Sequence, residues 1–156
     1  MSKLHHYALS LEWTGNKGTG TDGYRNYERS YTIRVENKPD LYGSSDPMFR
    51  GDRAKYNPEE MLVAALSSCH MLSFLHCCVN AGVVVTDYRD EAGGTMVLEG
   101  DGGRFTEVVL RPTVTVTEPE MVEKIRELHE QASRNCFIAS SVNFPVRHEP
   151  VTLVAG

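Results

Sequence analysis

Apolar and polar residues alternate in two stretches near the N-terminus, and this alternation predicts strands. One face of residues 6–13 carries Tyr7, Leu9, Leu11 and Trp13. Residues 31–36 repeat the pattern with Tyr31, Ile33 and Val35. A glycine-rich turn separates the two stretches, so we expect them to pair as a hairpin.

A long apolar run over residues 57–82 predicts one helix with defined ends. Asn57 can cap its N-terminus, Pro58 suits the first helical position, and Glu60 stands three residues after the cap. Gly82 is a typical residue just past a helix end. Polar residues interrupt the run, so we expect a buried helix rather than a membrane span; they are Ser67, Ser68, His70, Ser73 and His76.

The second half of the chain alternates again and predicts consecutive strands over residues 83–116, arranged as an antiparallel meander. Pro112 implies an edge position or a bulge. A second helix is predicted from a capping box at Thr117 to about Arg134, and a last strand over residues 142–154. Residues 37–56 form a long loop that contains Arg50 and Arg53, and loops of this length are usually functional or interfacial.

The order of these elements predicts an α+β fold in a single domain spanning residues 1–156. The 156 residues, 40% of them hydrophobic and 24% charged, suffice for one globular core. A net charge of −5 argues against nucleic acid or an anionic membrane as a partner. The N-terminal residues lack the apolar core of a secretory signal, so we expect a cytoplasmic protein in a reducing compartment.

The candidate chemistry lies in the cysteines, three of which belong to the long predicted helix. Cys69 stands about 18 Å along the helix from its N-cap, too far for the helix dipole to activate the thiol. A reactive Cys69 thiolate therefore needs a cation, and Arg is the residue that stays charged when desolvated. The upstream candidates are Arg25, Arg29, Arg50 and Arg53. Alternatively, Cys69 is a small buried core residue.

The fourth cysteine, Cys136, continues the inward face of the second predicted helix. Two thiols on packed elements suit a mechanism in which one attacks a peroxide and the other resolves the sulfenic acid as a disulfide. Cys136 could equally be a buried small residue. Cys77 and Cys78 are expected to pack in the core, because neighbouring cysteines in a helix point apart.

Metal binding and Cys-His hydrolysis find less support in the spacing. No two Cys or His residues of the long helix are three or four positions apart, so we expect no metal site. His70 follows Cys69 directly, and the two side chains diverge around a helix. The remaining candidate partners have no predicted place near Cys69; they are His5, His6, His129 and His148.

Residues 57–62 (NPEEML) and 64–70 (AALSSCH) resemble the signature of the OsmC/Ohr superfamily of thiol-dependent peroxidases, and Cys136 stands where that family has its second cysteine. The resemblance implies an OsmC-like fold along essentially the whole chain. This fold has antiparallel sheets, a long central buried helix and a second helix, in an intertwined homodimer. It also implies that Cys69 attacks, Cys136 resolves, and an Arg–Glu pair tunes the site.

Within this family pattern, Arg29 is our choice for the activating cation and Arg25 is second, although either could be a solvated hairpin charge. Glu59 is the expected carboxylate. It would lie about 15 Å from Cys69 along one helix, so it either serves the partner chain's cysteine or only complements the helix dipole. Phe137 follows Cys136, where the hydroperoxidases of the family usually have Pro.

We therefore predict a peroxidase that reduces organic hydroperoxides to alcohols, with hydrogen peroxide as a second candidate substrate. It would act as a homodimer and use an external dithiol reductant with no bound cofactor or metal. Two alternatives stay open. One is a small-ligand-binding protein of the same fold with inert cysteines. The other is a hydrolase or thiol transferase that uses Cys69 as a covalent nucleophile.

Overall fold

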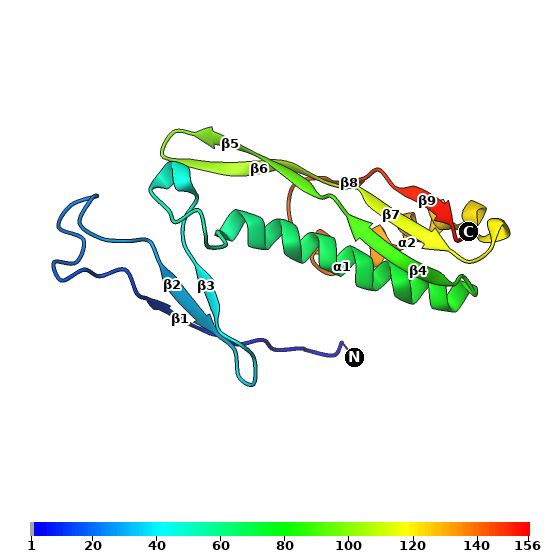
Figure 1. Ribbon diagram of the computed structural model, residues 1–156, viewed down its shortest axis with the longest axis horizontal. Helices are drawn as coiled ribbons and strands as arrows, with labels where there is room; N and C mark the ends of the chain where they lie inside the picture. The colour runs from blue at the N-terminus through cyan, green and yellow to red at the C-terminus, as the bar shows by residue number, and fades with distance from the viewer. Residues whose placement is uncertain (1) are drawn as a thin grey trace. The chain divides into compact units, whose positions relative to one another are not determined.

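The structure, a computed structural model, describes residues 2–156 and has the mixed α+β composition that the sequence predicts. It divides into two compact units, one ending at Met61 and the other spanning Leu62–Gly156. Helix α1 (Pro58–Ala81) begins in the first unit and continues in the second (Figure 1). The prediction of a single domain stays a prediction.

The N-terminal unit contains a three-stranded antiparallel sheet. Strand β1 (Ser10–Trp13) pairs with β2 (Tyr31–Arg34), which confirms the predicted hairpin, although β1 begins later than expected. The predicted loop contains a third strand, β3 (Leu41–Gly43), and a short 3-10 helix, η1 (Pro47–Phe49). Local patterning missed β3 because three residues are too few to show a period.

Helix α1 has the ends that the sequence predicts. The Asn57 side chain accepts from the backbone N–H of Glu60 at 2.8 Å, and the Glu60 carboxylate accepts from the N–H of Asn57 at 3.2 Å. These two bonds form a capping box. Beyond the helix, Gly82 has a φ of +71°, a left-handed conformation that glycine adopts without strain.

The C-terminal unit carries two mixed sheets instead of the predicted meander. One contains β4 (Val85–Asp90), β7 (Pro112–Val116) and β9 (Val151–Val154). The other contains β5 (Gly93–Glu99), β6 (Gly102–Leu110) and β8 (Val146–His148). Only β5 and β6 pair as sequence neighbours; β4 pairs with β7, and the two last strands join in parallel.

Pro112 marks the change from one sheet to the other. Strand β6 ends at Leu110, and β7 begins at Pro112 in the middle of the other sheet. The prediction of an edge position or a bulge at Pro112 is wrong, because a proline can also occupy the first position of a strand. The predicted last strand is likewise split into β8 and β9, with Pro150 between them.

The second helix begins later than predicted. A 3-10 helix, η2 (Pro119–Met121), precedes α2 (Val122–Asn135), and the N-cap residue of η2 is Glu118, which makes no side-chain cap bond. The prediction of a capping box at Thr117 is therefore wrong. The Thr117 hydroxyl instead lies 3.6 Å from the sulfur of Met121. A third 3-10 helix, η3 (Ala139–Ser141), follows α2.

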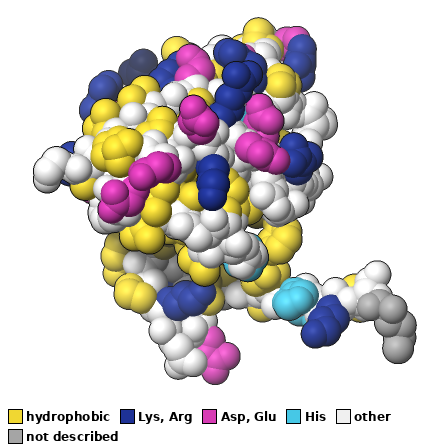
Figure 2. All heavy atoms as spheres, turned by 90° about the vertical axis from the view of Figure 1, so that its right-hand side faces the viewer, with side chains coloured by type: hydrophobic (Ala, Val, Ile, Leu, Met, Phe, Trp, Pro, Cys, Tyr) yellow, Lys and Arg dark blue, Asp and Glu magenta, His cyan; other side chains and the backbone are white. Residues whose placement is uncertain are grey.

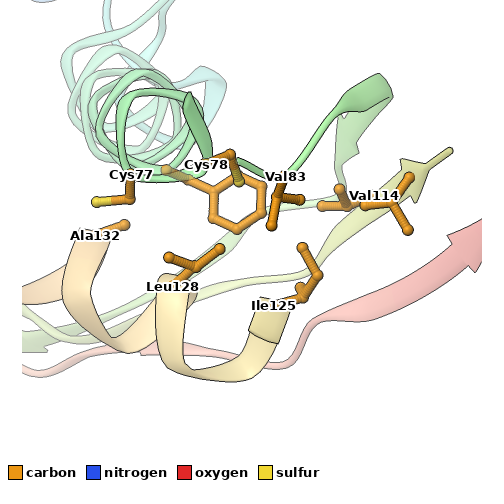
Figure 3. Packing of buried hydrophobic residues seen from close by; sticks show 9 residues of the cluster. Cys77, Cys78, Val83, Val114, Ile125, Leu128 and Ala132 are labelled. Atoms are coloured by element: carbon orange, nitrogen blue, oxygen red, sulfur yellow. The ribbon is translucent and has the colours of Figure 1, made fainter. Parts of the chain in front are cut away.

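Helices α1 and α2 and the strands share the core of the C-terminal unit. Figure 3 shows Cys77 and Cys78 of α1 facing Leu128 and Ala132 of α2. Both cysteines are buried, which confirms the expectation that they pack. A second cluster centres on Leu66, Val108 and Leu110.

Helix α1 is also long and apolar enough to cross a membrane, although a core helix passes the same test. Only 28% of its most apolar 18-residue window is buried within the chain. Leu72 and Val79 are largely exposed. The face drawn in Figure 2 mixes acidic with basic side chains, and hydrophobic side chains lie between them.

Candidate active site

Cys69 and Cys136 meet in the C-terminal unit although they are far apart in the sequence. Cys69 lies in the middle of α1 and is half-buried, whereas Cys136 follows the last residue of α2 and is buried. Both are free thiols, and they lie close enough for Cys69 to raise the pKa of Cys136. The structure therefore brings together the two cysteines that the sequence singled out.

The surroundings of Cys136 differ from those of Cys69. Cys136 has an extended backbone (φ −70°, ψ 116°), and the N–H of Ala139 donates to its sulfur at 3.4 Å. Burial and the neighbouring Cys69 thiol raise the pKa of Cys136 to about 11. Cys136 is therefore protonated at neutral pH, while Cys69 is the more accessible thiol of the two. This asymmetry suits an attacking Cys69 and a resolving Cys136.

Three histidines from three elements gather in the same unit: His70 from α1, His129 from α2 and His148 from β8. His70 and His129 are buried, and Nε2 of His70 lies 3.0 Å from Nδ1 of His129. Their rings are parallel, with centroids 5.3 Å apart, and His148 lies 5.7 Å from His70 and 6.0 Å from His129. Local sequence spacing does not indicate that His129 and His148 lie near His70.

Both inner histidines are neutral at ordinary pH. Burial and the nearby His148 lower the pKa of His70 to about 4, although the carboxylate of Asp90 partly opposes this shift. Burial and the two other histidines lower the pKa of His129 to about 3. Asp90 itself accepts from the Ser67 hydroxyl and from the backbone N–H of Arg111.

The outermost histidine borders a pocket. A cavity of about 380 Å³ is lined by His148 and by residues of α2 and β9, including Arg126 and Glu130. His148 is half-buried, and its ring also lies 6.0 Å from that of His129. Among residues 2–156, no group of three His, Cys, Asp or Glu side chains is arranged to hold a metal ion.

The predicted activating residues lie in the N-terminal unit. The Arg29 guanidinium donates to the carbonyls of Tyr24 and Tyr27, both at 2.8 Å. Its Cζ lies 3.9 Å from the centroid of the Tyr27 ring. Arg29 is thus a half-buried cation held in a fixed place, whereas Arg25 is exposed.

Glu59 is the second predicted residue of this unit. Its Oε2 atom is buried without a hydrogen-bond partner, and so is the hydroxyl of Tyr31. Burial and the Glu59 carboxylate raise the pKa of Tyr31. No ion pair among residues 2–156 joins Arg29 to Glu59. The roles of Arg29 and Glu59 stay predictions.

Residues 51–150 match the family model described as OsmC-like protein. The chain belongs to this family. A solved OsmC-like protein of unknown function from Vibrio cholerae is 31% identical, with a TM-score of 0.85 over 95% of this chain and 100% of that one. The uncharacterized protein YmaD of Bacillus subtilis is 22% identical over 142 residues, which cover 88% of this chain and 87% of that one.

Solved organic hydroperoxide resistance proteins share the fold of this chain. One from Elizabethkingia anophelis, solved with thiocyanate bound, is 16% identical, with a TM-score of 0.69 over 99% of this chain and 100% of that one. At this identity the likeness concerns the fold alone. The comparisons therefore confirm membership of the OsmC/Ohr superfamily and its α+β fold.

Proposed function

We propose that this OsmC-like protein is a thiol-dependent peroxidase that reduces organic hydroperoxides. The observation that carries the proposal is the proximity of the Cys69 and Cys136 thiols, which come from distant parts of the chain. Both are unpaired, one is accessible, and the other is buried with a raised pKa. Such a pair can pass from two thiols to one disulfide without a large movement of the chain.

In the proposed cycle, the Cys69 thiolate attacks one peroxide oxygen and the O–O bond breaks. The leaving alkoxide takes up a proton and departs as an alcohol, while Cys69 becomes a sulfenic acid. The sulfur of Cys136 then displaces the hydroxyl group of the sulfenic acid, and its proton leaves with that group as water. An external dithiol reduces the disulfide and is itself oxidised, so no bound cofactor or metal is required.

Arg29 and Glu59 complete the proposal. We propose that the Arg29 guanidinium stabilises the Cys69 thiolate and that Glu59 helps to orient it. Arginine suits this role because it remains charged when it is partly desolvated. The fixed carbonyl and aromatic contacts of Arg29 support a preorganised cation. The unpaired Oε2 atom of Glu59 is available for a partner.

We further propose a cytoplasmic homodimer whose only other partners are the hydroperoxide and the dithiol reductant, with neither nucleic acid nor membrane. The exposed apolar side chains of α1 support a second copy, because a soluble monomer rarely leaves a helix of this kind uncovered. A twofold dimer would give both copies equivalent sites.

The test uses the reduced full chain mixed with cumene hydroperoxide. Peptide mapping by mass spectrometry should find a disulfide between Cys69 and Cys136, together with cumyl alcohol in equal amount. The Cys136→Ser variant should stop at a sulfenic acid on Cys69, which a dimedone probe labels. Cys77→Ala is the matched control and should react like the unaltered chain. Unchanged thiols after peroxide treatment would contradict the proposal.

The same experiment separates the two alternatives. A ligand-binding protein with inert cysteines would consume no peroxide, and Cys69→Ser would leave its ligand affinity unchanged. A hydrolase or thiol transferase would carry an acyl or mixed-disulfide adduct on Cys69 and would tolerate Cys136→Ser. The accessible Cys69 beside a buried thiol favours the peroxidase, because a hydrolase has no use for a second cysteine.

A further inference from the structure

The histidine pair occupies a special place between the two helices that carry the thiols. His70 is the neighbour of Cys69 in α1, and His129 lies two helical turns before Cys136 in α2. Two hydrogen bonds join these helices. They are the His70–His129 hydrogen bond at 3.0 Å and the bond from the Ser73 hydroxyl to the carbonyl of Ala132 at 3.2 Å.

The remaining contacts between the helices are apolar. Residues such as Phe74, Leu128 and Ala132 pack without a preferred direction, because apolar burial depends on area rather than on angle. A buried hydrogen bond is directional, and it is kept because a polar atom without its partner is costly in a core. The His70–His129 bond can therefore fix how α1 lies along α2.

The hydrogen-bonding of His129 indicates which ring donates. Its Nε2 atom is buried and has no partner. If Nδ1 accepted the bond, Nε2 would carry a buried N–H group without an acceptor, which is rare in proteins. If Nδ1 donates to Nε2 of His70, only a lone pair is left unpaired. We therefore infer that Nδ1 of His129 donates, and both rings are neutral, in accord with their burial.

We propose that His70 and His129 are positioning residues for the thiol pair. Their hydrogen bond holds α1 and α2 in the alignment at which the sulfurs of Cys69 and Cys136 meet. The biological use of this alignment rests on the proposed peroxidase, in which Cys136 must reach the sulfenic acid on Cys69. The alignment itself does not depend on peroxide chemistry, so it can be measured separately.

The test measures the effective concentration of Cys136 toward Cys69. The protein is oxidised with diamide, which requires no peroxidase activity, and is equilibrated at neutral pH with mixtures of reduced and oxidised glutathione. The ratio of disulfide to dithiol gives the effective concentration. His129→Leu should lower it at least about tenfold, because the bond to His70 is lost.

His129→Asn is the conservative variant, because the Asn side-chain amide occupies nearly the place of Nδ1 and can still bond His70. It should keep the effective concentration within about twofold of the unaltered chain. His129→Gln moves its amide away from that place and should behave like His129→Leu. If the His129→Leu protein does not fold, His129→Gln takes its place in the test.

Leu128→Ala separates alignment from general stability. It opens a cavity in the same helix face and should lower the melting temperature, yet it keeps the histidine bond and should keep the effective concentration. The inference is wrong if removing the bond leaves the effective concentration unchanged, or if Leu128→Ala lowers it as much as His129→Leu. If peroxide fails to oxidise the unaltered chain while this pattern holds, only the proposed peroxidase is lost.

Discussion

The ring of His129 is stacked on the ring of Phe74, with centroids 4.0 Å apart and planes 9° from parallel. His129 is fully buried in this stack, and its neighbours include no carboxylate bonded to it. A charged imidazole would therefore lose its hydration without gaining a counter-ion. The ring stays neutral in the folded chain, as the lowered pKa of about 3 indicates.

Stability should fall in acid because of this burial. The unfolded chain binds protons on His70 and His129 near pH 6.5, whereas the folded chain binds them only near pH 4 and pH 3. Between these limits the unfolded state holds more protons, so the free energy of unfolding decreases as pH falls from about 6.5 towards 3. Above pH 6.5 both states hold these histidines neutral, so the histidines no longer lower the free energy of unfolding. Urea unfolding at pH 7 and pH 4.5 measures the difference.

A matched variant isolates the histidine contribution from that of the carboxylates, which also bind protons below pH 5. His129→Asn has no titrating ring at this position and should lose less stability between pH 7 and pH 4.5 than the unaltered chain. An equal loss in both proteins would show that His129 does not contribute to the acid sensitivity.

The capping box at the start of α1 should have a measurable effect on stability. Asn57→Ala removes the side chain that accepts from the N–H of Glu60, and we expect it to lower the free energy of unfolding by about 1 kcal/mol. Asn57→Asp keeps an acceptor at the same place and should cost less. Urea denaturation of the three proteins provides the comparison, and equal stability of the alanine and unaltered proteins would contradict it.

The close packing of Gly43 against Tyr31 predicts a larger loss of stability when Gly43 gains a side chain. A Cβ atom on Gly43 would lie 2.3 Å from Cζ of Tyr31, so the ring must move if Gly43 becomes alanine. We expect Gly43→Ala to destabilise the β2–β3 pairing by about 1–3 kcal/mol. Gly102→Ala is the control, because the nearest atom there is 4.0 Å away. Thermal melting, monitored by circular dichroism, should give a lower melting temperature for Gly43→Ala than for Gly102→Ala.

The sequence predicted those parts of the fold that local chemistry determines. The ends of α1 follow from Asn57, Glu60 and Gly82, whose side chains or backbone act within one helical turn. Strand pairing was predicted correctly only for sequence neighbours, β1 with β2 and β5 with β6. The parallel additions of β8 to β6 and of β9 to β7 join residues far apart in the chain, and no local pattern records such partners.

The residues of the candidate site were also predictable only where local spacing indicated their direction. Cys136 was predictable as an inward residue because it continues the helical spacing of Ile125 and Ala132. His129 stands beside Leu128 on that inward face, so the spacing offered a signal for its burial. His148 gave no such signal, because its approach to His70 depends on the parallel placement of β8.

The exposed apolar side of α1 yields the last prediction. Leu72 is 62% and Val79 is 77% exposed within the chain, although both stand in the long apolar helix α1. If a second copy covers them, Leu72→Glu would bury a charge without a partner, which costs several kcal/mol. Light scattering after size exclusion should find a dimer for the unaltered chain and monomer for this variant. Glu130→Gln, at an exposed position of α2, is the control and should remain dimeric. A monomeric unaltered chain would refute the homodimer.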